Sequence, residues 1–194
     1  MSDLPLSAIY SRKAFPGREY ITGSGDGNDD AGLIISGTVF LESVNPDGYR
    51  RILDCYTAGD YFWKKGLSAS SSSDNFVLIA RTKCDILFLH TTDTEDIRKI
   101  LPRYEPEDVL TAAQQRLLAH IHILSQHSHH EKILAFLEYH RTRAGENPFR
   151  LPMSLTDAAD YLAIDRSAMM RQIGLLEKEG LFSHHGRTFH ILQD

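Results

Sequence analysis

Two arginines, Arg166 and Arg171, are the residues whose type and spacing most clearly indicate a chemistry. They are predicted to lie near the start of one helix, on its exposed face, together with Ser167 and Met170. A guanidinium group can form paired hydrogen bonds with a guanine edge, and it can also bind a phosphate. Because a helix N-terminus attracts phosphate as well, this arrangement predicts contact with double-stranded DNA. Arg187, at the tip of a predicted hairpin, is expected to contact phosphate only.

The helix that carries the arginines is predicted to be the second helix of a helix-turn-helix motif. Ser154 is expected to cap the first helix, with Asp157 completing the capping box. A three-residue turn at 163–165 then leads into the second helix, expected over 166–179. Ser154 and Thr156, at the start of the first helix, complete the set of candidate DNA contacts.

A β-hairpin is expected directly after the second helix. The segments LFSH and RTFHIL flank His185 and Gly186, which are predicted to form a two-residue turn with glycine in its second position. A hairpin in this place is typical of a winged helix. The alternative is a helical pair with a β-hairpin cover that binds nothing. The exposed arginines favour the DNA-binding interpretation.

The charge of the chain does not by itself indicate a nucleic-acid-binding protein. The 194 residues have a formal net charge of −5; residues 1–104 carry 12 Lys and Arg against 14 Asp and Glu, and residues 105–194 carry 9 against 12. DNA-binding domains are usually basic. Any DNA contact must therefore come from the local placement of positive side chains.

Composition also limits the class of protein. The chain is 42% hydrophobic, which excludes disorder, and its two cysteines exclude a disulfide scaffold. No apolar run approaches the roughly 20 residues of a membrane helix, and the N-terminus does not resemble a signal peptide. We therefore expect a cytoplasmic protein without membrane contact.

The first half of the chain is predicted to form an antiparallel barrel or jelly roll. Strands are expected over 33–44, with a break at its glycine, and over 49–56, 75–80 and 84–89, and turn residues such as those of 45–48 separate them.

A short helix over 94–101 and a long helix from 106 to about 125 are expected next. Leu110, Leu117 and Leu124 recur every seven residues in the long helix, with Ala113 and His120 at the interleaved positions. This spacing predicts a coiled-coil seam and a homodimer. The alternative is one amphipathic helix that packs on its own domain. Further apolar residues, Leu118, Ile121 and Ile123, suggest that the helix does both. Residues 126–130 are predicted to form a hinge before a helix over 131–143.

The order of these segments resembles the Crp/Fnr superfamily, named after the cyclic-AMP-receptor and fumarate-nitrate-reduction regulators. The similarity rests on the residues of 154–192 and on shorter matches at 17–21, 36–39 and 58–62. It implies an α+β fold with an N-terminal cyclic-nucleotide-binding-like β-roll, a long dimerisation helix and a C-terminal winged helix-turn-helix. The corresponding domains are 1–104, 105–127 and 128–194. The resemblance also implies a homodimeric transcription regulator on a near-palindromic operator, with RNA polymerase as a further partner.

The sequence departs from the family in two places. Ser167 lies where the family often has a glutamate that binds cytosine, so the family's usual half-site should not be assumed. The family's Glu and Arg, which clamp a cyclic phosphate, have no counterpart near residues 60–73. An effector other than cyclic AMP, or none, is therefore expected. The candidate effector pocket consists of Tyr61, Trp63, Lys64, Lys65, Leu117, Leu118 and Ile121.

No residue set indicates catalysis, a metal or another cofactor. Cys55 and Cys84 are predicted to be small buried hydrophobic residues rather than a redox pair. The histidines between 120 and 130 straddle a helix end, whereas zinc requires fixed, convergent ligands. The alternative function is a small-molecule-binding cupin-like module whose C-terminal domain mediates protein contacts only. It is disfavoured because His90 is the only histidine in residues 1–104.

Overall fold

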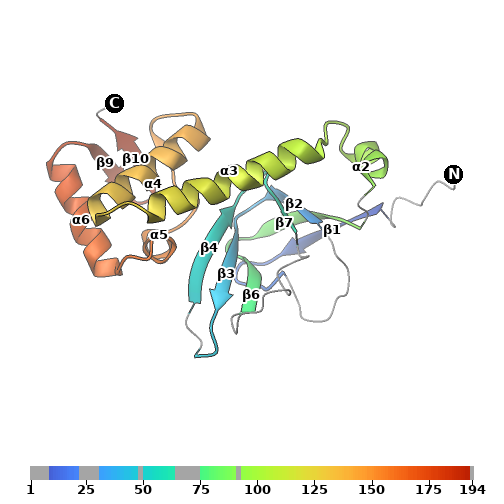
Figure 1. Ribbon diagram of the computed structural model, residues 1–194, viewed down its shortest axis with the longest axis horizontal. Helices are drawn as coiled ribbons and strands as arrows, with labels where there is room; N and C mark the ends of the chain where they lie inside the picture. The colour runs from blue at the N-terminus through green and yellow to red at the C-terminus, as the bar shows by residue number, and fades with distance from the viewer. Residues whose placement is uncertain (1–8, 22–30, 48–49, 64–74, 91–92, 193–194) are drawn as a thin grey trace. The chain divides into compact units, whose positions relative to one another are not determined.

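The computed structural model describes residues 9–21, 31–47, 50–63, 75–90 and 93–192. The chain divides into two compact units, residues 1–114 and 115–194 (Figure 1). Helix α3 (Pro106–Leu124) contributes residues to both units. The domain limits expected from the sequence, at 104/105 and 127/128, stay predictions.

Seven antiparallel strands form two sheets in the described part of the first unit. One sheet has the order β1-β7-β2-β5 and the other the order β4-β3-β6. The predicted strand segments are confirmed over the described residues; Gly48 and Tyr49, in the predicted turn and at the start of the strand expected over 49–56, lie outside them. Strands β1 and β5 are additional. The bounds are β1 (Tyr10–Phe15), β2 (Ala31–Ser36), β3 (Val39–Val44), β4 (Arg50–Tyr56), β5 (Tyr61–Trp63), β6 (Asn75–Ala80) and β7 (Cys84–Leu89).

An aromatic core joins the two sheets. Phe15, Tyr56, Phe62 and Phe88 belong to one buried cluster to which all seven strands contribute. The ring centroid of Phe62 lies 6.2 Å from that of Tyr56 and 6.2 Å from that of Phe88, in edge-to-face packing. Phe62 also covers Gly32 so closely that a Cβ atom there would lie 2.1 Å from its ring. Aromatic side chains from both sheets thus pack against one another, and the expected α+β fold is confirmed.

A second apolar cluster lies outside the aromatic core. Because successive side chains of a strand point to opposite faces, Tyr61 lies on the other side of β5 from Phe62. Its ring packs against Tyr104, with the centroids 5.9 Å apart. Residues of α2 (Thr94–Ile100), which confirms the helix expected over 94–101, complete this cluster.

The described part of the second unit combines the end of α3 and three further helices with a three-stranded antiparallel sheet of order β8-β10-β9. The bounds are α4 (His129–Ala144), β8 (Phe149–Arg150), α5 (Leu155–Tyr161), α6 (Arg166–Lys178), β9 (Phe182–His185) and β10 (Thr188–Ile191). Strand β8 was not expected from the sequence.

The predicted hinge at 126–130 is partly wrong, because α4 begins before the expected residue 131. Ser128 is the N-cap of α4, and its hydroxyl accepts a hydrogen bond from the N–H of Glu131 at 3.1 Å. The Glu131 carboxylate accepts the N–H of Ser128 in return. This capping box extends the helix through His129 and His130.

His140 of α4 is a buried histidine in an aromatic setting. Its ring lies 4.6 Å from Phe136 and 5.1 Å from Tyr139, between centroids. Its Nε2 has no hydrogen-bond partner in the described part of the chain. Burial, with a smaller contribution from the charge of Arg143, lowers the pKa of His140 to about 3.

The second unit is therefore expected to lose stability in mild acid. Below the unfolded-state pKa of about 6.5, the unfolded chain binds a proton that folded His140 rejects. The free energy of unfolding should fall by up to about 1.4 kcal/mol per pH unit as the pH decreases from about 6.5 towards 3. Thermal unfolding followed by circular dichroism, with His140→Phe or His140→Leu as reference, measures this contribution. Equal pH slopes in the wild type and both variants would show that His140 does not titrate in this way.

Candidate nucleic-acid interface

The capping box expected at the start of α5 is present. The N–H of Asp157 donates to Ser154 Oγ at 3.1 Å, and the Asp157 carboxylate accepts from the Ser154 N–H at 3.2 Å. The Ser154 hydroxyl also donates to that carboxylate at 2.7 Å. Ser154 therefore has a defined role in the fold, whereas Thr156, next to it, is exposed.

The turn between α5 and α6 contains a residue in the left-handed conformation, Ala163, with a φ of 53°. Asp165 then caps α6, because its Oδ1 accepts the N–H groups of Ser167 at 2.9 Å and Ala168 at 3.1 Å. Hydrogen bonds from the Ser167 hydroxyl and from these two N–H groups hold the pKa of Asp165 below its usual value. The cap fixes the start of the helix that carries the candidate arginines.

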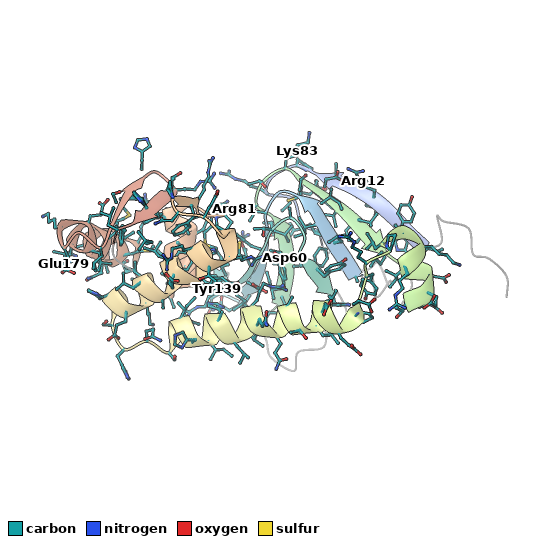
Figure 2. The ribbon with its side chains drawn as sticks, turned by 90° about the horizontal axis from the view of Figure 1, so that it is seen from above. Arg12, Asp60, Arg81, Lys83, Tyr139 and Glu179 are labelled. Carbon is teal, nitrogen blue, oxygen red and sulfur yellow. The ribbon has the colours of Figure 1, made fainter. Side chains whose placement is uncertain are left out.

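Helix α6 has one buried and one exposed face. The predicted inward residues Met169, Ile173 and Leu176 are each at most 1% exposed. The four candidate residues are all exposed: Arg166, Ser167, Met170 and Arg171. The helix ends at Glu179, which is labelled in Figure 2. The structure thus places the four candidate residues together at the start of α6, on the side that the protein does not cover.

The hairpin after α6 is present, but its turn lies one residue later than expected. His185 pairs with Thr188, so Gly186 and Arg187 are the two turn residues. Glycine is first rather than second, and its φ of 61° explains the register, because this position requires a positive φ. Arg187 lies at the tip of the wing as expected, and its side chain is half-buried.

One contact between α6 and the wing was not predicted from the sequence. Glu177 Oε1 accepts the N–H of His184 at 2.9 Å and lies 2.8 Å from His184 Nδ1. The His184 ring stacks on Phe189, with centroids 5.0 Å apart. Partial desolvation raises the pKa of Glu177, but the hydrogen bonds from His184 lower it more, and the net shift is downward. Only the tertiary fold brings these residues, seven positions apart, together.

The exposed apolar stripe of α3 differs from the expected seam. Leu110, Leu117 and Leu124 are exposed, at 61%, 60% and 36%. His120, expected in the seam, is buried in its own chain. Its ring stacks on Tyr161 at 3.9 Å between centroids, and its Nε2 lies 3.0 Å from the Tyr161 carbonyl oxygen.

Ile121, rather than His120, continues the stripe. It is 55% exposed and lies four residues after Leu117 and three before Leu124. The stripe through 110, 114, 117, 121 and 124 has the alternating 3–4 spacing of a coiled coil, and Gln114 is its one polar residue. Ala113, the other expected partner of the leucines, is half-buried beside this stripe.

The candidate effector pocket stays a prediction. Lys64 and Lys65 lie outside the described residues, and Trp63 is half-buried at the end of β5. Tyr61 belongs to the outer apolar cluster with Tyr104. The other candidates, on α3, belong to the second unit and are exposed: Leu117, Leu118 and Ile121.

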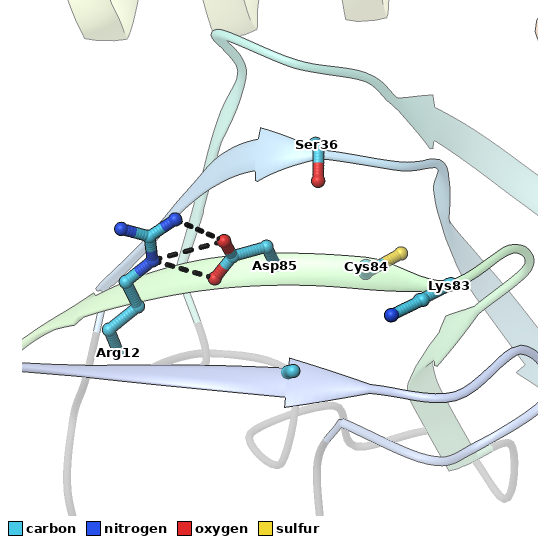
Figure 3. A pocket seen from close by; sticks show the side chains of 6 residues that line it. Arg12, Ser36, Lys83, Cys84 and Asp85 are labelled. Atoms are coloured by element: carbon cyan, nitrogen blue, oxygen red, sulfur yellow. Dashed lines mark hydrogen bonds and ion pairs between the residues drawn. The ribbon is translucent and has the colours of Figure 1, made fainter.

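A separate surface pocket lies on β1, β2 and β7. Arg12 donates to both carboxylate oxygens of Asp85 (Figure 3), and Lys83 lies in the turn before β7 (Figure 2). Arg12 lowers the pKa of Asp85 through this hydrogen bonding. Ser36 and Cys84 also line the pocket. The basic group of Arg12 is already paired with Asp85, whereas Lys83 lies exposed beside them.

Cys55 and Cys84 are buried free thiols, as expected. Burial raises the pKa of Cys84. In the part of the chain that the structure covers, no three His, Cys, Asp or Glu residues are grouped so that they could hold a metal ion. Over the same residues, no helix is both long and apolar enough to cross a membrane.

The chain is similar to known proteins over nearly its whole length. No family model matches the chain. The nitrogen fixation regulation protein FixK of Rhizobium meliloti (strain 1021) is 27% identical over 100% of this chain and 86% of its own length. Electron transport regulator A of Shewanella oneidensis is 25% identical over 95% of this chain and 76% of its own. The solved structure of FixK2 from Bradyrhizobium japonicum has a TM-score of 0.72 at 19% identity, covering 95% of this chain and 93% of that one.

Proposed function

Because the chain belongs to the Crp/Fnr superfamily of DNA-binding transcription regulators, we propose that it acts as a homodimer on a near-palindromic operator. The exposed leucine stripe of α3 supports the dimer, since a helix face of this kind is usually covered by a second helix. Two identical winged helices related by a twofold axis bind two inverted half-sites, which explains why the operator should be near-palindromic.

Helix α6 is proposed to enter the major groove with its N-terminal turns. The exposed group of Arg166, Ser167, Met170 and Arg171 on a capped helix is the observation that carries this proposal. Arg171 binds a base edge, most simply guanine, and Arg166 binds a base edge or a phosphate. Arg187 at the wing tip binds phosphate, and Ser154 and Thr156 lie near the backbone at the start of α5.

Arg171→Ala is expected to weaken operator binding by about 1–3 kcal/mol and to relax the preference at one base pair of each half-site. The probe is the duplex that the wild-type chain enriches from a pool with 20 random base pairs, together with its single-base variants. Binding is measured by fluorescence anisotropy over a series of salt concentrations.

Arg187→Ala is the comparison variant, because a phosphate contact carries no sequence information. It should weaken binding to all duplexes alike and reduce the salt slope by about 1 per half-site. If Arg171→Ala instead weakens all duplexes equally, Arg171 binds the backbone and the base contacts lie elsewhere.

The effector is proposed not to be cyclic AMP. In the family a Glu and an Arg clamp the cyclic phosphate, and residues 60–73 contain neither. Burying a phosphate without such a clamp is costly. Calorimetric titration with micromolar cyclic AMP or cyclic GMP should therefore give no saturable heat. Saturable binding would contradict this and would direct attention to Lys64 and Lys65.

One of the relatives indicates a further partner, RNA polymerase. The transcriptional activator protein FnrL of Cereibacter sphaeroides is 21% identical over 97% of this chain and 79% of its own length. An activator acts on RNA polymerase, so we propose RNA polymerase as a partner here, in the cytoplasm where operator DNA lies. We expect no enzymatic activity. The cupin-like alternative requires several histidine ligands, whereas residues 1–104 contain only His90, whose Nε2 lies 2.8 Å from Ser11 Oγ.

A further inference from the structure

Gly174 is the only glycine inside a helix among the residues that the structure describes. Apart from proline, glycine is the least favourable residue in a helix interior. A Cβ atom at Gly174 would meet no described atom within 4 Å, outside its own helix backbone and its two neighbours. The folded chain therefore has room for a side chain at this position, and its packing does not explain the glycine.

The position of Gly174 on α6 indicates what approaches it. Ser167, Arg171, Gly174 and Lys178 follow one another at intervals of four, three and four residues, and thus lie along one helix face. Arg171 and Lys178 are both exposed on either side of the glycine. Within the described residues, Lys178 has no hydrogen bond or ion pair. This helix face has a basic side chain on either side of a residue without a side chain, and it can therefore bind the negatively charged backbone of a DNA strand.

We propose that the sugar–phosphate backbone of one operator strand packs directly against α6 at Gly174, too close for a side chain. Arg171 lies about 4.5 Å nearer the helix start and Lys178 about 6 Å nearer its end, at 1.5 Å per residue. Arg171 thus contacts the base edges, Gly174 admits the strand, and Lys178 binds the next phosphate. Gly174 is a positioning residue that sets how deeply α6 enters the groove.

Replacing Gly174 by alanine should have opposite effects on folding and on binding. The melting temperature should rise by about 2–4 °C, because alanine favours the helix. The affinity for the duplex enriched by the wild-type chain should fall at least 10-fold, and Gly174→Leu should weaken it further. Single-base variants of the duplex should lose affinity in parallel, since a backbone contact carries no sequence preference.

Thr142→Ala, on the exposed face of α4, is the control for helix stabilisation, and it should bind as the wild type does. Gly174 can take this role only if α6 binds the operator, so Arg171→Ala is measured beside it. If Gly174→Ala binds within twofold of the wild type while Arg171→Ala is weakened, the role of Gly174 is refuted and the proposed function stands. If both bind normally, α6 is not the DNA-binding helix. A lowered melting temperature for Gly174→Ala would show that the fold itself requires the glycine, which also refutes the proposal.

Discussion

Leu117→Asp is expected to convert the protein from dimers to monomers. Leu117 is 60% exposed at the centre of the α3 stripe, so a twofold seam would bring two aspartates together in a desolvated interface. Burying unpaired like charges costs several kcal/mol. A monomer contacts one half-site only, so operator affinity should fall by about 100-fold or more. Sedimentation velocity gives the oligomeric state, and anisotropy with the enriched duplex gives the affinity.

Gln115→Asp is the matched control for this substitution. Gln115 is an exposed residue of the same helix, two positions away and outside the stripe. It adds the same charge without entering the seam, so the dimer should persist. Ile121→Asp should act like Leu117→Asp, because Ile121 lies in the stripe. A dimeric Leu117→Asp variant would place the interface on another surface.

Gly37→Ala is expected to cause a large loss of stability in the first unit. Gly37 joins β2 to β3 with a φ of 95°, which disfavours any residue with a Cβ atom. A Cβ atom there would also lie 2.4 Å from the Lys83 carbonyl oxygen and 2.7 Å from Cys84 Sγ. Since the obstacle includes backbone, relief requires strands β2 and β7 to shift. We expect the free energy of unfolding to fall by about 3–5 kcal/mol.

Gly59→Ala separates the two causes of this loss, the positive φ and the steric clash of the Cβ atom. Gly59 has a φ of 90°, but a Cβ atom there would meet no described atom within 4 Å. The free energy of unfolding of this variant should therefore fall by only about 1–2 kcal/mol, the conformational cost of a positive φ. Urea unfolding followed by the fluorescence of Trp63, the single tryptophan, reports on this unit. Equal losses for the two variants would mean that the contact with Lys83 and Cys84 relaxes at no cost.

Local sequence determined the elements of the candidate interface. Ser154 and Asp165 predict two helix starts because a side-chain oxygen before a helix can accept its free N–H groups, and both caps are present. The spacing of Met169, Ile173 and Leu176 predicts the buried face of α6, and therefore also which arginines are exposed. These features depend on residues within one or two turns of each other, so the sequence contains the information directly.

The tertiary structure decided which neighbour covers each face. Heptad spacing placed His120 in the seam, but its stacking on Tyr161 turns it inward and leaves Ile121 exposed. The pairing of Glu177 with His184 likewise depends on how the wing folds back on α6. Periodicity defines which residues share a face of a helix or strand. Only long-range packing determines whether that face is covered by its own chain or is left for DNA or a second copy.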